Sequence, residues 1–522
     1  MDTNKEDNMH KILKSFHKFK DSSLTSLLLK NIRPVDINNA EYIFILNPVH
    51  SKFAQKLYTL LSHELSTHGI PSCFLFQNDL LSPYYPKLSI DGHEITNSLD
   101  LVEKRFVKLL NRHELFFDWK VEIKNERIEA EGINFFPFIR NTLRMIQKRY
   151  NVFFTDDNNN PVYSALVQSC DILLHYFFLL KSYSKKHDKK IRFVGWEISY
   201  IPNGIFKFLC DRLSHNRDVE FIELERGYII YFGQHTLKDS YVTCSNLTKA
   251  KLPFGLVISR DELAGIAEEK IDLDKLYKPL SNAVEKKIYS EIPINQESVI
   301  QTIHGYKSRG RKVFVLFSHL FYDTPVDDES PAFNGMCDWI NETVKYFAGK
   351  EDLLLIKPHP SELRKDLPKK APNETVASFL RDTRLSKNII ILEPRLFAIK
   401  DLSPLMSCGL IWRSSVALEL TFLGIPCIIA GKPYYTELNF SFASDKEDYF
   451  RMIKQSHEIQ VTDKQRIDVA KYVYLLESKH VHADCISYDT TLRKFYWNRR
   501  ALRNFLKNSN ENIKSLVENI LQ

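Results

Sequence analysis

The chain has 522 residues, of which 44% are hydrophobic, 12% aromatic and 26% charged, and its formal net charge is +7. This length and composition are typical of a globular protein of two or three domains and argue against a disordered chain. The excess of positive charge is small for this length, so we expect no nucleic acid among the partners.

The first half of the chain alternates apolar runs with helical patterns. Residues 1–40 read as a polar N-terminal leader, and residues 41–270 are predicted to form a Rossmann-like domain, because strand, loop and helix patterns alternate as around a parallel sheet. The expected strands are 41–46, 71–76, a polar strand near 121, 152–154, 190–196 and 219–222, and the expected helices are 51–69, 99–110, 138–149, 162–184 and 205–214.

The second half repeats this alternation. A charged, glycine-poor linker is predicted over residues 271–310, followed by a second Rossmann-like domain over 311–476 and a C-terminal helical tail over 477–522. Within the second domain, apolar strands are expected at 353–356 and 408–411.

A polar segment follows each of these two strands: Lys357–Glu362 after the first and Trp412–Glu419 after the second. In an open α/β sheet, ligands bind in the crevice beyond the carboxyl ends of the strands, where both segments would lie. The sequence therefore predicts a single site built from both.

The residue types in these segments suit a phosphate and a sugar. Ser414 and Ser415 stand where a strand gives way to a helical pattern, so one is a candidate N-cap beside free amides that attract an anion. Glu419, about one turn further on, is placed to accept hydrogen bonds from a sugar hydroxyl. Lys357 and His359 would add a charge and a hydrogen-bond donor to the same phosphates. The alternative is that the serine pair only caps a helix.

An ordered set of segments (317–323, 333–336 with Trp339 and 342–344, 352–362, 414–419, 424–426 and 430–431) resembles the catalytic half of bacterial capsule polysaccharide biosynthesis proteins. Those proteins are similar to GT-B glycosyltransferases. The resemblance implies an α/β, GT-B-like fold with two Rossmann-like domains facing across a cleft, and a nucleotide-activated sugar held mainly by the C-terminal domain.

The resemblance also implies a set of donor-binding residues. It points to His359, Glu362, Ser414, Ser415 and Glu419, and the neighbouring cations complete the predicted donor site: Lys357 and Arg413. Family members tend to carry arginine at the position of Lys357 and a small-residue turn at that of Arg413–Ser415. Lysine keeps the charge but loses bidentate geometry, so the phosphate contact is expected to differ here.

The N-terminal domain is expected to present the acceptor and a general base. Glu225 follows the strand predicted to end at Ile222, and a carboxylate there is suited to take the proton of an attacking hydroxyl. Glu225 and His359 are therefore the predicted catalytic residues. Asp156 and His235 are alternatives for the base, and Glu225 can instead be a surface charge beside Arg226. Further candidate contacts with the sugar or cleft are His319, Asp323 and Tyr434.

Several common site types are missing from the sequence. The eight cysteines occur without Cys-x-x-Cys pairs or Cys/His ligand spacing, which argues against a disulfide framework and a zinc site. Neither Gly-x-Gly-x-x-Gly nor Gly-Lys-Ser/Thr occurs. The acidic pairs Asp156-Asp157 and Asp327-Asp328 lack the Asp-x-Asp spacing of a diphosphate-bound metal, so we expect no cofactor and metal-independent transfer.

The C-terminal tail is basic and aromatic. Residues 491–507 hold six basic residues and no acidic ones, interleaved with aromatic side chains, a pattern that can lie on an anionic membrane where lipid-linked glycan acceptors reside. The favoured alternative is that a C-terminal helix braces the first domain. Without a signal pattern at the N-terminus or an apolar run near 18 residues, the expected location is the cytoplasm, with peripheral contact at the inner face of the cytoplasmic membrane.

Together these features predict a glycosyltransferase that moves a sugar from a nucleotide-activated donor to a surface or capsular polysaccharide or its lipid-linked acceptor. A CMP-linked acid such as Kdo or a sialic-type sugar is preferred, on the resemblance alone. Two alternatives remain: a phosphotransferase that uses a CDP-polyol, as in teichoic acid synthesis, and a non-catalytic GT-B-like scaffold of a capsule assembly complex.

Overall fold

The protein was analysed as a computed structural model, which describes most of the chain. The described residues are 23–33, 35, 40–46, 52–74, 89–90, 93–94, 115–155, 162–196, 198–214, 218–226, 241–246, 258–272, 296–322, 330–363, 372–489, 494–508 and 510–521. The predicted helix at 99–110 and the candidate residues Asp156, His235 and Asp323 lie outside them.

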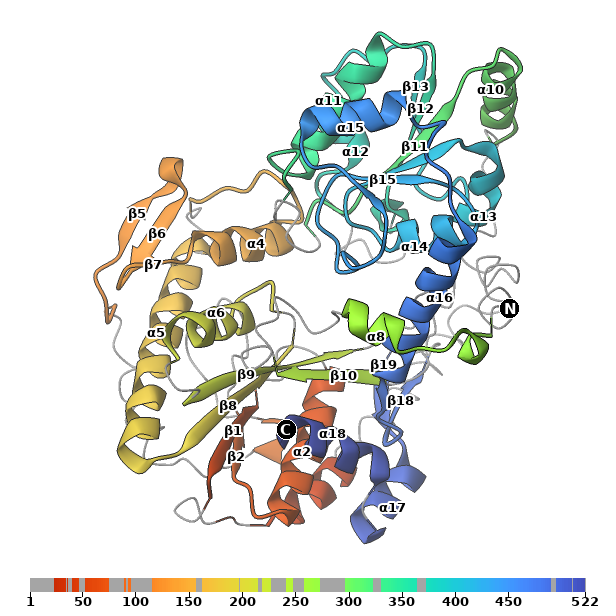
Figure 1. The fold of residues 1–522 in the computed structure, drawn as a ribbon. Helices are drawn as coiled ribbons and strands as arrows, with labels where there is room; N and C mark the ends of the chain where they lie inside the picture. Colours follow the sequence, from red (N-terminus) through yellow and green to blue (C-terminus); the bar gives the residue numbers. More distant parts are fainter. Residues whose placement is uncertain are drawn as a thin grey trace, which may run out of the picture.

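The first domain is built on a six-stranded sheet with the order β17-β10-β9-β8-β1-β2 (Figure 1). Its strands are β1 (Tyr42–Leu46), β2 (Ser72–Phe74), β8 (Lys190–Gly195), β9 (Val219–Arg226), β10 (Tyr241–Asn246) and β17 (Val481–His482). The four strands from β2 to β9 are parallel, whereas β10 and β17 are added antiparallel. The expectation of a purely parallel sheet was therefore wrong at this edge.

Helices cover both faces of this sheet. On one face α4 (Phe136–Gln147), α5 (Val162–His187) and α6 (Asn203–Leu213) enclose one core, and on the other α2 (Lys52–Thr67) and α18 (Glu511–Leu521) enclose a second. The strand β1 has the sequence YIFIL and is buried on both faces, which explains its continuous apolar run.

The second domain holds a six-stranded sheet with the order β13-β12-β11-β14-β15-β16, in which every pair is parallel. Its strands are β11 (Val313–Phe317), β12 (Leu353–Lys357), β13 (Ile389–Ile391), β14 (Cys408–Ile411), β15 (Cys427–Ile429) and β16 (Ser441–Phe442). Numbered within the domain, this order is 3-2-1-4-5-6, the doubly wound Rossmann order. The expected α/β fold with two Rossmann-like domains is confirmed.

Two cores flank the second sheet. Helices α11 (Met336–Ala348), α12 (Val376–Phe379) and α15 (Lys446–Lys454) pack on one face, and α10 (Gln296–Ser308), α13 (Ile399–Leu402), α14 (Val416–Phe422), α16 (Asp463–Ser478) and α8 (Arg260–Ala264) pack on the other. Helix α10 lies within the predicted linker, yet Val299 and Ile303 are part of this second core. That part of the linker therefore belongs to the second domain.

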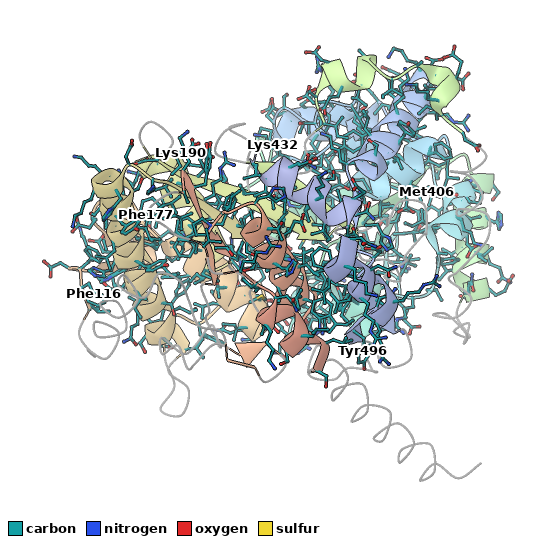
Figure 2. The ribbon with its side chains drawn as sticks, turned by 90° about the horizontal axis from the view of Figure 1, so that it is seen from below. Phe116, Phe177, Lys190, Met406, Lys432 and Tyr496 are labelled. Atoms are coloured by element: carbon teal, nitrogen blue, oxygen red, sulfur yellow. The ribbon has the colours of Figure 1, made fainter. Side chains whose placement is uncertain are left out.

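The C-terminal tail returns to the first domain. Strand β17 pairs with β10, and the buried Arg192 donates from Nη1 to the carbonyl oxygens of Ile520 (2.6 Å) and Leu521 (2.8 Å) at the end of α18. Figure 2 shows Tyr496 of the tail lying with the first domain. The tail is only partly helical, because β18 (Ile486–Asp489) and β19 (Lys494–Trp497) form an antiparallel pair before α17 (Arg499–Asn508).

One predicted strand does not form. Residues 152–154 are a loop, in which Phe153 is 61% exposed. Its backbone groups hydrogen-bond to the side chain of Gln147 at 3.0 Å each, where a strand would bond to a neighbour. The sequence segment at 120–134 forms the small sheet β5 (Lys120–Glu122), β6 (Arg127–Ala130) and β7 (Ile133–Asn134).

Helix α5 is long and apolar enough, by length and composition, to cross a membrane, and 61% of its apolar window is buried inside the protein. Its buried residues form much of the core on one face of the first sheet, where α5 contacts β8. Helix α5 is therefore a core helix of the first domain.

Candidate functional site

The second sheet brings three predicted segments to one edge. In the strand registers, Phe317 at the end of β11 lies opposite Lys357 at the end of β12 and Ile411 at the end of β14. His319, His359 and Arg413 each follow one of these residues by two positions. Three adjacent strands thus end level with one another, and each delivers an imidazole or a guanidinium to the same edge.

The strand order also places a topological switch point at this edge. Strands β11 and β14 are where the order of the doubly wound sheet reverses, and in such folds ligands bind outside the carboxyl ends of the strands at this topological switch point. His319 and Arg413 follow these two strands. The segment of His359 lies one strand further out, about 5 Å along the sheet.

His319 is a neutral imidazole held beside a positive charge. Burial, and then the nearby Arg413 guanidinium, lower the pKa of His319 from 6.5 to about 4. Its Nε2 atom is buried, and within the described residues it has no hydrogen-bond partner. At neutral pH this ring can donate or accept a hydrogen bond without carrying charge.

Two further buried polar atoms at the same strand ends lack partners among the described residues: Ser318 Oγ and Trp412 Nε1. Both side chains are almost fully buried, with relative exposures of 6% and 0%. A buried polar group without a partner costs about 1–3 kcal/mol, and most native proteins satisfy such groups with protein, water or ligand. Within the described residues, the ends of β11 and β14 therefore hold buried hydrogen-bonding groups without partners, of which Trp412 lies in the core against Trp339.

The His359 segment is held by its own hydrogen bonds. His359 Nδ1 accepts from the backbone N–H of Ser361 at 3.1 Å, which leaves Nε2 as the protonated nitrogen when the ring is neutral. Arg395, in the loop after β13, donates from Nε to the Pro360 carbonyl oxygen at 3.3 Å. The segment is thus a fixed turn that presents an imidazole N–H.

Two members of the predicted donor site are buried within this segment. Lys357 is 5% exposed, and its Nζ donates to the Pro394 carbonyl oxygen at 2.5 Å. Glu362 is 8% exposed and accepts from the Val376 N–H at 3.2 Å. Burial raises the pKa of Glu362 to about 7, against the lowering effects of the Val376 hydrogen bond and of Lys357. Both side chains are buried and hydrogen-bond to backbone groups of neighbouring segments, which fixes the turn in place.

The serine turn differs from its predicted form. Ser415 is the N-cap of α14, but its side chain makes no capping bond. The amides of the first turn already have acceptors: Val416 N–H bonds to Ser414 Oγ (3.3 Å), Ala417 N–H to the Ser414 carbonyl (3.3 Å) and Leu418 N–H to the Ser415 carbonyl (2.9 Å). The amides of Val416, Ala417 and Leu418 are therefore not available to bind an anion. The charge of this turn comes from Arg413.

Tyr435 fixes the backbone of this turn. The fully buried hydroxyl donates to the Ser414 carbonyl oxygen at 2.5 Å. Its neighbour Tyr434 packs edge-on against it, and the Tyr434 carbonyl oxygen accepts from Tyr472 on α16 at 3.2 Å. Tyr434 thus has a packing role in addition to the predicted sugar contact. Glu419 lies half-buried one turn into α14.

The predicted base occupies a different setting from the one expected. Strand β9 continues past Ile222 to Arg226, and Glu225 pairs with Thr243 of the antiparallel strand β10. Glu225 is therefore a strand residue of the first sheet and does not follow the strand in a loop. The pairing with β10 extends β9, and β10 was not predicted because its sequence, YVTCSN, is too polar to stand out.

Metal-binding groups are not apparent in the part of the chain that the structure describes, where no cluster of three His, Cys, Asp or Glu side chains occurs. His319, His359 and Arg413 are the chemical groups gathered at the switch-point edge. Arg413 supplies a positive charge and the two imidazoles supply neutral hydrogen-bonding groups, and arginine and imidazole N–H groups bind phosphate oxygens.

No protein-family model and no curated protein matches the chain. Among solved structures it is similar to two forms of KpsC from Thermosulfurimonas dismutans. One is described as a β-Kdo 2,7 transferase (15% identity over 64% of this chain and 90% of that chain, TM-score 0.31). The other is a β-Kdo 2,4 transferase (13% identity, 61% and 87%, TM-score 0.32).

A third similar structure is Anabaena Alr3699/HepE in complex with UDP-glucose (9% identity over 62% of this chain and 78% of that chain, TM-score 0.24). Scores this low assign neither a fold nor an activity. The fold of the chain rests on its own strand orders, and its function rests on the residues at the switch-point edge.

Proposed function

We propose that this protein is a GT-B-type glycosyltransferase that binds a nucleotide-activated sugar at the carboxyl edge of the second sheet. The observation that carries the proposal is the level ending of β12, β11 and β14, each followed two residues later by His359, His319 or Arg413. Among the described residues, His319 Nε2 and Ser318 Oγ at the end of β11 have no hydrogen-bond partner, which adds support, since a bound ligand would satisfy them.

The chemistry follows from these groups. In sugar transfer, the bond between the anomeric carbon and the phosphate oxygen breaks, and the nucleotide leaves with the electron pair. A new bond forms to the acceptor hydroxyl, whose proton passes to a base. Arg413 and the N–H of His359 would stabilise the charge that develops on the departing phosphate, so the reaction needs no metal ion. Glu225 remains our candidate base, by its place in the first domain.

A CMP-linked sugar acid is the preferred donor, and a surface or capsular polysaccharide or its lipid-linked precursor the preferred acceptor. Both preferences come from the sequence resemblance described above. A CDP-polyol phosphotransferase is the alternative that keeps the same site, and a non-catalytic scaffold the alternative that has no turnover. We propose that the protein acts in the cytoplasm.

We propose that contact with the membrane is electrostatic. Four basic residues of α17 are exposed, and within the described residues none pairs with a carboxylate: Arg499, Arg500, Arg503 and Lys507. The aromatic residues Trp497 and Phe505 are buried against the first domain, so they are not available to enter a bilayer. Binding to anionic vesicles should therefore fall steeply with added salt.

Release of nucleotide tests the proposal and separates its alternatives. Release of CMP or UDP from a nucleotide sugar in the presence of a glycan acceptor supports a glycosyltransferase, and release of CMP from CDP-glycerol supports the phosphotransferase. Arg413→Ala and His359→Ala should lower the rate at least tenfold, whereas the surface variants Arg451→Ala and His457→Ala should leave it unchanged. Absence of turnover with every donor would support the scaffold.

A further inference from the structure

The two domains meet at a clasp between the end of α4 and the loop that precedes α12. Asn373 makes the first contact. Its backbone N–H donates to the Lys148 carbonyl (2.9 Å), and its side-chain Nδ2 donates to the Gln147 carbonyl (2.7 Å). Lys148 is the left-handed C-cap of α4, with φ of 52°. We call residues 147–151 together with 373–374 the α4 clasp.

Glu374 makes the charged contact in the α4 clasp. Its Oε2 atom accepts from the backbone N–H groups of Tyr150 at 2.7 Å and Asn151 at 3.4 Å. A hydrogen bond to a charged group is stronger than a neutral one. Arg144 of α4 holds the other side, donating to the Tyr150 carbonyl at 3.0 Å and lying 4.3 Å from the centre of its ring.

The clasp is connected to the His359 turn through a short chain of hydrogen bonds. Directly after Glu374, Thr375 caps α12, and the N–H of Val376 donates to the carboxylate of Glu362. The backbone N–H of Glu362 in turn donates to the His359 carbonyl at 2.9 Å. Only Thr375 separates Glu374 in the clasp from Val376, whose amide donates to Glu362.

A second connection runs through aromatic rings. Tyr150 meets Phe321 edge-to-face with ring centres 6.3 Å apart, and Phe321 meets Phe379 of α12 at 5.4 Å. Phe321 is buried and follows His319 by two residues. The loop at the end of α4 therefore contacts both the β11 and β12 sides of the candidate site, although it belongs to the other domain.

We propose that Glu374 is a positioning residue: it holds the first domain against the turn that carries His359, and so sets how the acceptor side meets the bound donor. This inference deepens the proposed function and rests on it for its effect on turnover. The mechanical part stands on the contacts alone, because breaking the α4 clasp should loosen the His359 turn through Val376 and Glu362.

Hydrogen exchange of the full-length protein tests the mechanical part without any ligand. Glu374→Ala should speed exchange at least tenfold in peptides covering 147–153, and also in those covering 358–363 and 375–380. Glu374→Gln keeps an acceptor oxygen and should restore part of the protection. Glu447→Ala, an exposed glutamate of α15, is the control and should change neither region. Faster exchange at 147–153 with unchanged exchange at 358–363 would overturn the connection.

Steady-state kinetics test the positioning role. Because the clasp joins the first domain to the turn of His359, a proposed donor contact, Glu374→Ala should lower kcat at least tenfold, and Glu374→Gln should recover much of kcat. Equal kcat in wild type and Glu374→Ala would refute the role. If the wild-type protein turns over no donor, the proposed function fails, and the exchange experiment still decides whether the clasp and the turn are connected.

Discussion

The buried imidazole of His319 should make the stability of the second domain depend on pH. The folded-state pKa of His319 is about 4, against 6.5 for an unperturbed ring, because burial and Arg413 oppose its protonation. In the unfolded chain the pKa of the ring is about 6.5. Stability from the neutral ring is therefore complete above pH 6.5 and is lost as the pH falls toward 4.

The size of this loss follows from linkage. With pKa values of 6.5 unfolded and about 4 folded, His319 should cost the folded state about 2 kcal/mol at pH 5 relative to pH 8. For a domain of 150–250 residues, this corresponds to a fall in melting temperature of about 4–8 °C. His319→Gln keeps a polar side chain of similar size but does not titrate, so it should remove this component.

The assay is urea unfolding of wild type and His319→Gln between pH 8 and pH 5, followed by hydrogen exchange in peptides from β11 and β14. The difference in unfolding free energy between the two proteins should shrink by about 2 kcal/mol over this range, in the direction that disfavours the wild type at low pH. A parallel pH dependence in both proteins would refute the placement of a neutral His319 beside Arg413.

Two other predictions concern buried charges. The pKa of Glu362 is raised to about 7, so ionisation of this carboxyl group opposes folding. As the pH rises from 4.5 through 7, the wild type should therefore lose stability relative to Glu362→Gln, as measured by urea unfolding. A difference in unfolding free energy between the two proteins that does not change with pH would contradict this prediction. The buried pair of Arg192 Nε and Glu220, 2.9 Å apart, should make Glu220→Ala cost about 3–5 kcal/mol of the free energy of unfolding. Disruption of the exposed pair Lys190–Glu41 by Glu41→Ala should change the free energy of unfolding far less.

The sequence predicted much of the fold where local signals were strong. The strand at 42–46 and the helix at 52–67 were found because a run of apolar residues and an amphipathic pattern are local properties. The strand expected at 152–154 failed because its backbone bonds are met by the side chain of Gln147, which no period in the sequence reveals.

The site was predicted in part, for a related reason. The polar segments after β12 and β14 could be recognised from the strands before them, but the sheet order that places β11 between them depends on long-range pairing. His319 was therefore only a candidate contact, although Val313–Phe317 is as apolar as the strand preceding His359. Tyr435, whose hydroxyl fixes the Ser414 carbonyl, carries no sequence signal apart from its place after β15.

We propose that a nucleotide binds at the ends of β11 and β14, and isothermal titration calorimetry measures this binding without turnover. CMP, CDP and UDP would be titrated into wild type, Arg413→Ala and the surface control Arg451→Ala. We predict that at least one nucleotide binds wild type and control alike and binds Arg413→Ala at least tenfold more weakly, since a hydrogen bond to a charged group contributes about 1.5–3 kcal/mol. Equal affinity of all three proteins, or no binding of any nucleotide to the wild type, would contradict the account.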